Sequence, residues 1–75
     1  MTKFVVTDCG EALTLTKCDR ATVIFDGRFE ERAIYVADDG SYWAQLDGKF
    51  RELAVREWRD GKPNGFRACR SAATR

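Results

Sequence analysis

Four Asp-Gly pairs punctuate the middle of this sequence, and they limit its fold more than any other feature. They lie at Asp26-Gly27, Asp39-Gly40, Asp47-Gly48 and Asp60-Gly61. Asp-Gly between apolar runs is typical of a two-residue β-hairpin, because a type I′ turn requires a positive φ at both central residues. Glycine adopts a positive φ without steric cost, and aspartate tolerates it. The pairs therefore predict a series of hairpins.

The segment that follows one of these turns occurs twice. DGRFEERAI begins at Asp26 and DGKFRELAV begins at Asp47, and both read Asp-Gly, a base, Phe, any residue, Glu, any residue, Ala, then Ile or Val. Each copy ends at another Asp-Gly pair after the same number of residues. We interpret the chain as containing a duplicated hairpin unit, which concerns its architecture and leaves its chemistry open.

Most segments between the turns have the composition of strands. β-Branched and aromatic residues, which favour strands, are frequent in them. The predicted strands are residues 4–6, 12–16, 21–25, 33–37, 41–46 and 65–69. The last of these follows the predicted loop DGKPNG.

Residues 49–59, KFRELAVREWR, fit two structures. Phe50, Leu53 and Trp58 fall at helical spacing, and the residue types of the segment slightly favour a helix. The equivalent part of the first copy contains Ile-Tyr-Val, which favours a strand. Because two units with the same flanking turns are expected to share one conformation, we predict a strand and keep the helix as the alternative.

The predicted fold is all-β (β-rich): a small antiparallel meander of five to seven short strands, curled into a barrel or roll. Curling removes the open edges and the solvated face that a flat sheet of this kind leaves. The alternative is an α+β fold with one helix at about 49–59. A chain of 75 residues holds one domain at most. We assign residues 1–70 to it and expect residues 71–75 to fray.

Both faces of the central strands carry apolar side chains. Neighbours along a strand point to opposite faces, so the repeat defines two sets. The first set is Phe29, Tyr35, Phe50 and Trp58. The second set is Ile34, Val36, Leu53 and Val55. We expect one set to form the core and the other to be partly exposed, with bulges deciding which.

The three cysteines, Cys9, Cys18 and Cys69, are an odd number, which is unusual for a disulfide framework. We expect reduced thiols in a reducing compartment, with a Cys9–Cys18 pair across a hairpin as the alternative. No apolar run approaches the about 20 residues of a membrane span, and the first residues lack a signal peptide's apolar core. The predicted location is the cytosol of the protein's own cell or of a host cell.

The residues that usually carry out catalysis are scarce. The chain has no histidine, which is the commonest general base and metal ligand. It has no phosphate-binding loop of the G-x-x-x-x-G-K-[ST] kind, and its two serines lack a nucleophile-elbow context. Glu30 and Glu31 are strand neighbours that point to opposite faces, so they cannot share a substrate. We predict a protein that is not an enzyme and that has no cofactor and no metal site.

Charge is distributed unevenly along the chain. Residues 1–48 hold five bases and nine acids, a balance of −4, whereas residues 49–75 hold eight bases and three acids, a balance of +5. Nine of the thirteen bases are arginine, the side chain best suited to bidentate contacts with carboxylate or phosphate. A folded domain can mix the two halves in space and cancel the difference.

Aromatic and arginine side chains are the candidate binding residues. Trp, Tyr and Arg are the commonest hot spots of protein interfaces, and aromatics interleaved with Arg also bind single-stranded nucleic acid. The predicted partner-binding residues are Tyr42, Trp43, Arg51, Arg56, Trp58, Arg59, Arg67 and Arg70, with Phe66 as a further aromatic. The competing interpretation makes each tryptophan a core residue and each arginine a solvated surface residue.

Two functions compete on these observations. The first is a protein-binding module, an inhibitor or adaptor that docks on an acidic surface of a larger protein or complex. Small phage or mobile-element proteins that inhibit host defence, such as anti-CRISPR proteins, are similar in size and composition only. The second is a small barrel that binds single-stranded nucleic acid through the basic C-terminal half, although pI 7.7 is low for such a protein.

Overall fold

Six β-strands make up the protein, and a computed structural model describes residues 2–7 and 10–68 of it. The strands are β1 (Thr2–Val6), β2 (Ala12–Phe25), β3 (Arg28–Ala37), β4 (Tyr42–Leu46), β5 (Lys49–Arg59) and β6 (Lys62–Ala68). The described residues contain no helix. The all-β prediction is therefore confirmed, and the α+β alternative is wrong.

The segment 49–59 is strand β5, as the repeat predicts. Its helical residue types are overridden because β5 pairs with β4 along its first half and with β6 along its second half. The two copies of the repeat thus become β3 and β5, each following an Asp-Gly turn. Neither helix propensity nor helical spacing outweighs two ladders of backbone hydrogen bonds.

Three of the four Asp-Gly pairs form the predicted turn. Asp26 and Gly27 have φ of 56° and 74°, and Asp47 and Gly48 have 54° and 78°. Asp60 also has a positive φ, of 53°. The pair at Asp39-Gly40 differs, since only the glycine has a positive φ, 88°.

The loop between β3 and β4 is therefore not the predicted two-residue turn. The amide of Gly40 donates to the carbonyl of Ala37 at 2.9 Å, and the amide of Ala37 donates to the carbonyl of Ser41 at 2.8 Å. Such a loop is a turn followed by a left-handed residue that forms a bulge. The additional Asp38 before the pair lengthens the connection.

Strand β2 joins two segments that the sequence presents as separate strands, 12–16 and 21–25. A bulge between Lys17 and Arg20 interrupts the ladder with β3, so Cys18 and Asp19 lie opposite a single residue. A bulge bends a strand and increases its twist, which lets one long strand serve two parts of the structure. Strand β6 also differs from the prediction, because it begins at Lys62 within the expected loop.

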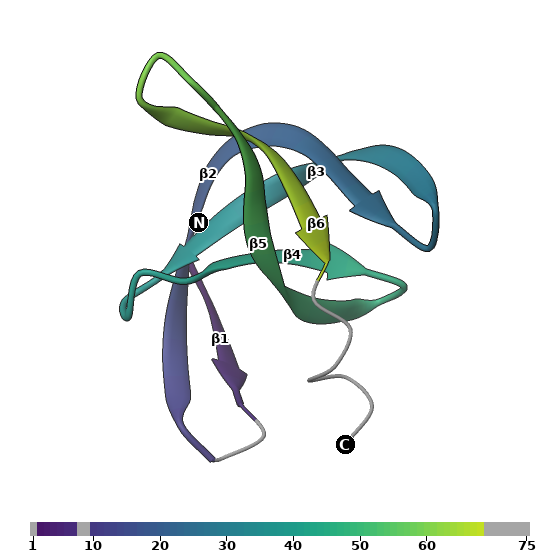
Figure 1. Ribbon diagram of the computed structural model, residues 1–75. Helices are drawn as coiled ribbons and strands as arrows, with labels where there is room; N and C mark the ends of the chain where they lie inside the picture. Colours follow the sequence, from purple (N-terminus) through teal and green to yellow (C-terminus); the bar gives the residue numbers. More distant parts are fainter. Residues whose placement is uncertain (1, 8–9, 69–75) are drawn as a thin grey trace.

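The sheet closes on itself. Strands β2 to β6 follow one another in an antiparallel meander, and β6 then pairs with β2. Five strands in a meander bring the first and last into the same direction, so the closing pair is parallel. It joins Thr22–Ile24 to Gly65–Arg67. The result, visible in Figure 1, is a closed five-stranded barrel with β1 as an extra strand beside the first half of β2.

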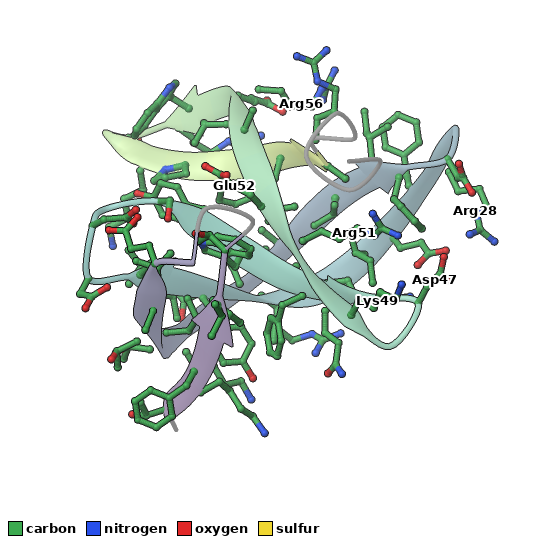
Figure 2. All side chains as sticks on the ribbon, turned by 90° about the horizontal axis from the view of Figure 1, so that it is seen from below. Arg28, Asp47, Lys49, Arg51, Glu52 and Arg56 are labelled. Atoms are coloured by element: carbon green, nitrogen blue, oxygen red, sulfur yellow. The ribbon has the colours of Figure 1, made fainter. Side chains whose placement is uncertain are left out.

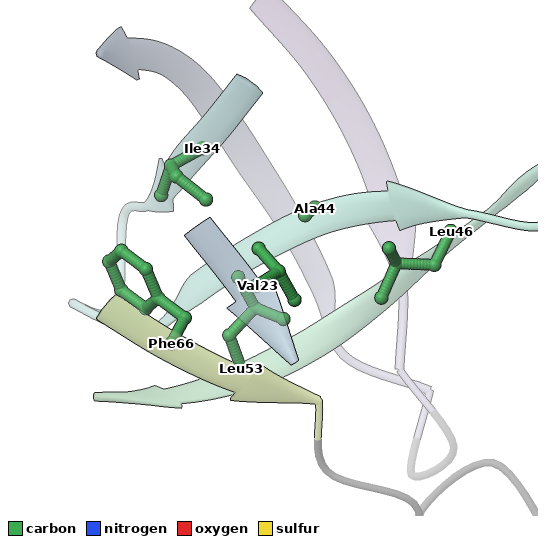
Figure 3. Close-up of a cluster of buried hydrophobic side chains, with 6 residues drawn as sticks. All are labelled: Val23, Ile34, Ala44, Leu46, Leu53 and Phe66. Atoms are coloured by element: carbon green, nitrogen blue, oxygen red, sulfur yellow. The ribbon is translucent and has the colours of Figure 1, made fainter. Parts of the chain in front are cut away.

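The barrel interior is the first of two hydrophobic clusters. Every barrel strand contributes at least one side chain to it, and Figure 3 shows them converging. The cluster consists of Val23, Ile34, Ala44, Leu46, Leu53 and Phe66. All are at most 5% exposed, so this cluster provides the main burial of apolar area that stabilises the fold.

The second cluster lies on the other face of the same sheet. It consists of Leu13, Leu15, Tyr35, Ala37 and Trp43, with Val5 and Phe50 packed against it. Tyr35 belongs to this cluster while its neighbour Ile34 belongs to the barrel interior. The first half of β2 and strand β1 therefore cover a face that would otherwise be apolar and exposed.

No helix long and apolar enough to cross a membrane is present among the residues described.

Replacing Gly48 tests the turn geometry. Nothing lies within 4 Å of a Cβ added at Gly48, so the strain of a side chain at φ +78° is isolated from steric clashes. We expect Gly48→Val to lower the free energy of unfolding by about 1–3 kcal/mol. Gly48→Asn, which tolerates a positive φ, should lose clearly less. Equal urea midpoints for the wild type and both variants would contradict this turn type.

Candidate interaction surface

The hairpin of β5 and β6 extends beyond the barrel. β2 pairs only with Gly65–Arg67 of β6, whereas β5 pairs with β6 as far as Arg59 and Lys62. Residues 56–64 thus form a two-stranded arm, which projects from the barrel in Figure 1. Pro63 fits this position because a residue without an amide hydrogen is tolerated where one edge of the strand is unpaired. The arm is accessible to a partner from both faces.

A bulge in β5 marks the base of the arm. Arg56 and Glu57 lie opposite Gly65, so two residues face one. A Cβ added at Gly65 would lie 3.4 Å from Glu57 Oε1 and 3.6 Å from Arg56 Cγ. Both side chains therefore leave the strand on the same side and pass over the glycine.

Four bases share the outer face of this hairpin, and we refer to them as the basic face. Phe66 is 2% exposed and points into the barrel, so its neighbours Gly65 and Arg67 point outward. Glu57 pairs with Gly65 and shares its face, so alternation along β5 places Arg59 and its partner Lys62 outward as well. A second register shift, between Glu57 and Trp58, accounts for the odd spacing of Gly65 and Lys62 along β6. The basic face is Arg56, Arg59, Lys62 and Arg67, and each of these residues is exposed.

No base of the basic face forms an ion pair with a described residue, although the Glu57 side chain lies on the same side of the hairpin. Within the described part of the chain, every ion pair lies on β2 and β3: Arg20–Glu31 at 3.9 Å, Arg28–Glu30 at 3.6 Å and Arg32–Glu30. None involves a base of β5 or β6. The bases of the C-terminal half that the structure describes are therefore without ion pairs, whereas three arginines of the N-terminal half are paired.

Trp58 lies on the arm but on its other face. It pairs with Pro63 across the hairpin and is 61% exposed. Since strand neighbours point to opposite faces, Trp58 and Arg59 leave the arm in opposite directions. The arm therefore presents one large aromatic side chain on one face and the bases on the other.

Arg51 is separate from the basic face. It shares the inward-facing register of Leu53, and its guanidinium lies 5.3 Å from the centre of the Phe25 ring. Its Nε atom is buried without a hydrogen-bond partner. Figure 2 shows Arg51 at the end of the barrel near Asp47 and Lys49, and Arg56 pointing away from the fold. Arg51 therefore contributes to the packing at the end of the barrel.

Tyr42 and Trp43 also serve the core. The ring of Tyr42 packs 5.3 Å from that of Phe66. Trp43 is 8% exposed, and its indole Nε1 donates to Ser41 Oγ at 2.7 Å. The remaining predicted residue, Arg70, lies outside the described residues, as do Cys9 and Cys69.

The Ser41 hydroxyl connects Trp43 to the loop before β4. Ser41 Oγ donates to Asp39 Oδ1 at 2.5 Å, and the Ser41 amide donates to the same oxygen at 3.0 Å. These hydrogen bonds stabilise the charged form of the carboxylate and lower the pKa of Asp39 below its ordinary value. The loop thus orients the largest side chain of the second cluster.

The structure brings together Arg56, Arg59 and Arg67 of the predicted set. It adds Lys62, which the sequence places in a loop, to the same face. Three exposed apolar residues that sequence reasoning missed lie elsewhere, Phe4 and Val6 on β1 and Phe29 on β3. Across the residues that the structure describes, no three His, Cys, Asp or Glu side chains converge in a way that could hold a metal ion.

Comparison with known proteins identifies no relative. No protein-family model matches the chain, and no curated protein or solved structure matches it either.

A titration of Asp39 tests the loop. Its pKa lies below 3.8 in the folded protein because the Ser41 hydrogen bonds favour the carboxylate. A depressed folded pKa stabilises the protein above the unfolded pKa, and this contribution is lost as the pH falls through the folded pKa. We expect Ser41→Ala to raise the pKa of Asp39 toward 3.8, measured by NMR of the side-chain carboxyl group. An unchanged pKa would show that Ser41 Oγ does not hold Asp39.

Charge reversal separates packing arginines from surface arginines. Arg51→Glu should lower the free energy of unfolding by about 1–2 kcal/mol, because it removes the contact with Phe25 and sets a carboxylate against the ring. Arg59→Glu should change it by less than about 0.5 kcal/mol. Both are measured by urea unfolding, and equal effects of the two variants would contradict the different roles assigned to these residues.

Proposed function

We propose that this protein is a non-enzymatic binding module, an inhibitor or adaptor that binds an acidic protein surface through the β5–β6 arm. The observation that carries the proposal is the basic face: four exposed bases on one hairpin, none of them paired with a carboxylate. Unpaired arginines on a projecting hairpin are suited to bidentate contacts with Asp and Glu of a partner.

The placement of the aromatic side chains favours a protein partner. Proteins that bind single strands interleave stacking rings with bases on one surface. Here Trp58 and Arg59 point to opposite faces of the arm, and Tyr42 and Trp43 pack in the core. A partner cleft that encloses the arm contacts both faces at once, with Trp58 on an apolar wall and the arginines on an acidic one.

Trp58 supplies a substantial part of such a contact. A standard interface buries about 800 Å² on each partner, and a fully buried tryptophan supplies about 150–250 Å² of that area. Trp and Arg are the residue types on which binding energy concentrates. Charge complementarity also accelerates association, so the basic face is expected to raise the association rate most at low salt.

Nucleic-acid binding is the second candidate, and the lack of ion pairs on β5 and β6 favours it as well, because phosphates are the other common ligands of arginine. The two candidates differ in salt dependence. Contacts with several phosphates weaken steeply and linearly on a log–log plot of affinity against salt. An interface centred on Trp58 weakens less.

We place this function in a reducing compartment such as the cytosol. Cys18, the one cysteine that the structure describes, is exposed and forms no disulfide. An exposed thiol of this kind is typical of proteins from reducing environments.

Affinity capture from a nuclease-treated lysate tests the proposal. The immobilised wild-type chain should retain a stoichiometric protein partner, identified by mass spectrometry. Arg59→Glu and Trp58→Ala should each reduce its recovery by about tenfold or more, the loss expected for a hot-spot contact. Two matched controls should retain it: Arg20→Glu, an equal charge change on β2, and Phe29→Ala, an exposed aromatic 69% accessible on β3.

Three outcomes would overturn the proposal. Recovery of nucleic acid alone, lost with nuclease and moderate salt, would establish the second candidate instead. A partner retained equally by all four variants would show that the arm has no role in binding. Loss of the partner with Arg20→Glu as well would show that binding depends on the net charge of the protein and not on the position of the basic face.

A further inference from the structure

Strand β1 has one edge along which no described strand pairs. Its only strand neighbour among the described residues is β2, which pairs with all five of its residues. Phe4 and Val6 are 76% and 72% exposed, the most exposed large apolar side chains that the structure describes. They lie two residues apart and so point to the same face. Val5 points to the opposite face, where it packs against the second hydrophobic cluster.

The backbone of Phe4 and Val6 also points to the open side. Thr7 N donates to Glu11 O at 2.8 Å, which makes Thr7 and Glu11 a hydrogen-bonded pair at the end of the β1–β2 ladder. Such pairs alternate in an antiparallel ladder, so Val5 and Lys3 also bond to β2. The N–H and C=O groups of Thr2, Phe4 and Val6 therefore face the open edge.

This edge carries little of the protection by which proteins usually prevent edge pairing. Protected edges are very short or carry charges, especially lysine, a proline or a bulge. β1 reads TKFVV, with one lysine, no proline and an uninterrupted register to β2. Phe and Val also favour strands strongly. An edge of this kind is suited to an additional strand.

We propose that the occupant of this edge is β1 of a second copy of the chain, paired antiparallel about a twofold axis at Phe4. In this register Phe4 lies opposite Phe4 of the second copy, and Thr2 lies opposite Val6 of the second copy. These are the residues whose backbone groups face the open edge, so each pair exchanges two hydrogen bonds. A register shifted by one residue would place Phe4 opposite Lys3 or Val5 of the second copy, whose backbone groups bond to β2, and would form none.

Side chains and charges fit the same register. The two Phe4 rings meet on one face, flanked by Val6 of each copy, and aromatic and β-branched side chains on one face stabilise paired strands. On the other face Lys3 lies opposite Val5 of the second copy, so no like charges oppose each other across the pair. The strand is thus complementary to itself, as a twofold interface requires.

The area of this contact sets the strength of the dimer. Phe4 presents on the order of 150 Å² and the edge as a whole stays below the about 800 Å² per partner of a standard interface. We expect a concentration-dependent dimer with a dissociation constant of roughly 10⁻⁵ to 10⁻³ M. The dimer carries two arms, which raises the avidity for a partner complex that repeats its acidic site. The pairing itself does not depend on the proposed function.

Sedimentation equilibrium of the full chain between about 10 µM and about 1 mM tests the proposal. The mass should rise from 8.5 kDa toward twice that value and stop there, because a twofold contact closes. Val6→Pro removes an amide that faces the open edge, and Phe4→Lys places two charges at the twofold axis. Both variants should remain monomeric. The matched control Phe29→Lys changes an equally exposed aromatic elsewhere and should dimerise like the wild type.

Hydrogen exchange gives a second readout that does not rely on a variant folding. In the dilute wild type the amides of Lys3 and Val5 should be protected and those of Phe4 and Val6 should exchange fast. At high concentration Phe4 and Val6 should become protected as well. Fast exchange at every concentration with a constant mass of 8.5 kDa would overturn the proposal. So would continued growth beyond the dimer, or dimerisation lost in Phe29→Lys. These results are independent of whether the arm captures a partner.

Discussion

The parallel pairing of β2 with β6 is the constraint on which the rest of the structure depends. It involves only Thr22–Ile24 and Gly65–Arg67, yet it converts a meander with two open edges into a closed barrel. Closure surrounds Val23 and Phe66 with all five strands and makes the interior cluster inaccessible to solvent. It also ends at Gly65, so the β5–β6 hairpin continues past the barrel as an unsupported arm. The arm on which the proposed function rests is therefore a direct consequence of how far the closing pair extends.

Bulges determine which side chains are available for binding. The bulge at Cys18 and Asp19 bends β2, so that its first half covers one face of the sheet while its second half closes the barrel on the other. The bulge opposite Gly65 turns Arg56 to the outer side, where it joins Arg59 and Arg67. Without either bulge, the side chains that follow it along the strand would point to the opposite face of the sheet. Surface chemistry in this small fold thus depends on single-residue insertions.

The local features of the fold could be predicted from the sequence, and the long-range ones could not. Three Asp-Gly turns and the strand at residues 49–59 follow from turn chemistry and the repeat. The continuity of β2 was hidden because KCDR, its middle segment, has little strand character and because bulges leave no clear pattern. Equivalent positions of the repeat also differ: Phe29 is 69% exposed, whereas Phe50 packs 5.2 Å from the Tyr35 ring. The same limit applies to the candidate site. Whether Arg51 points into the barrel or out to solvent depends on the strand register, which no local sequence pattern encodes.

Barrel closure is tested most directly by NMR of the uniformly labelled protein, through backbone nuclear Overhauser effects between β2 and β6. The closed barrel predicts contacts of Val23 with Phe66 and of Ile24 with Arg67 in a parallel pattern, together with slow exchange of the amides that join these strands. A β6 that shows contacts only with β5, and fast amide exchange along Thr22–Ile24, would contradict closure. In that case the interior cluster would be open on one side, and the boundary between barrel and arm would have to be redrawn.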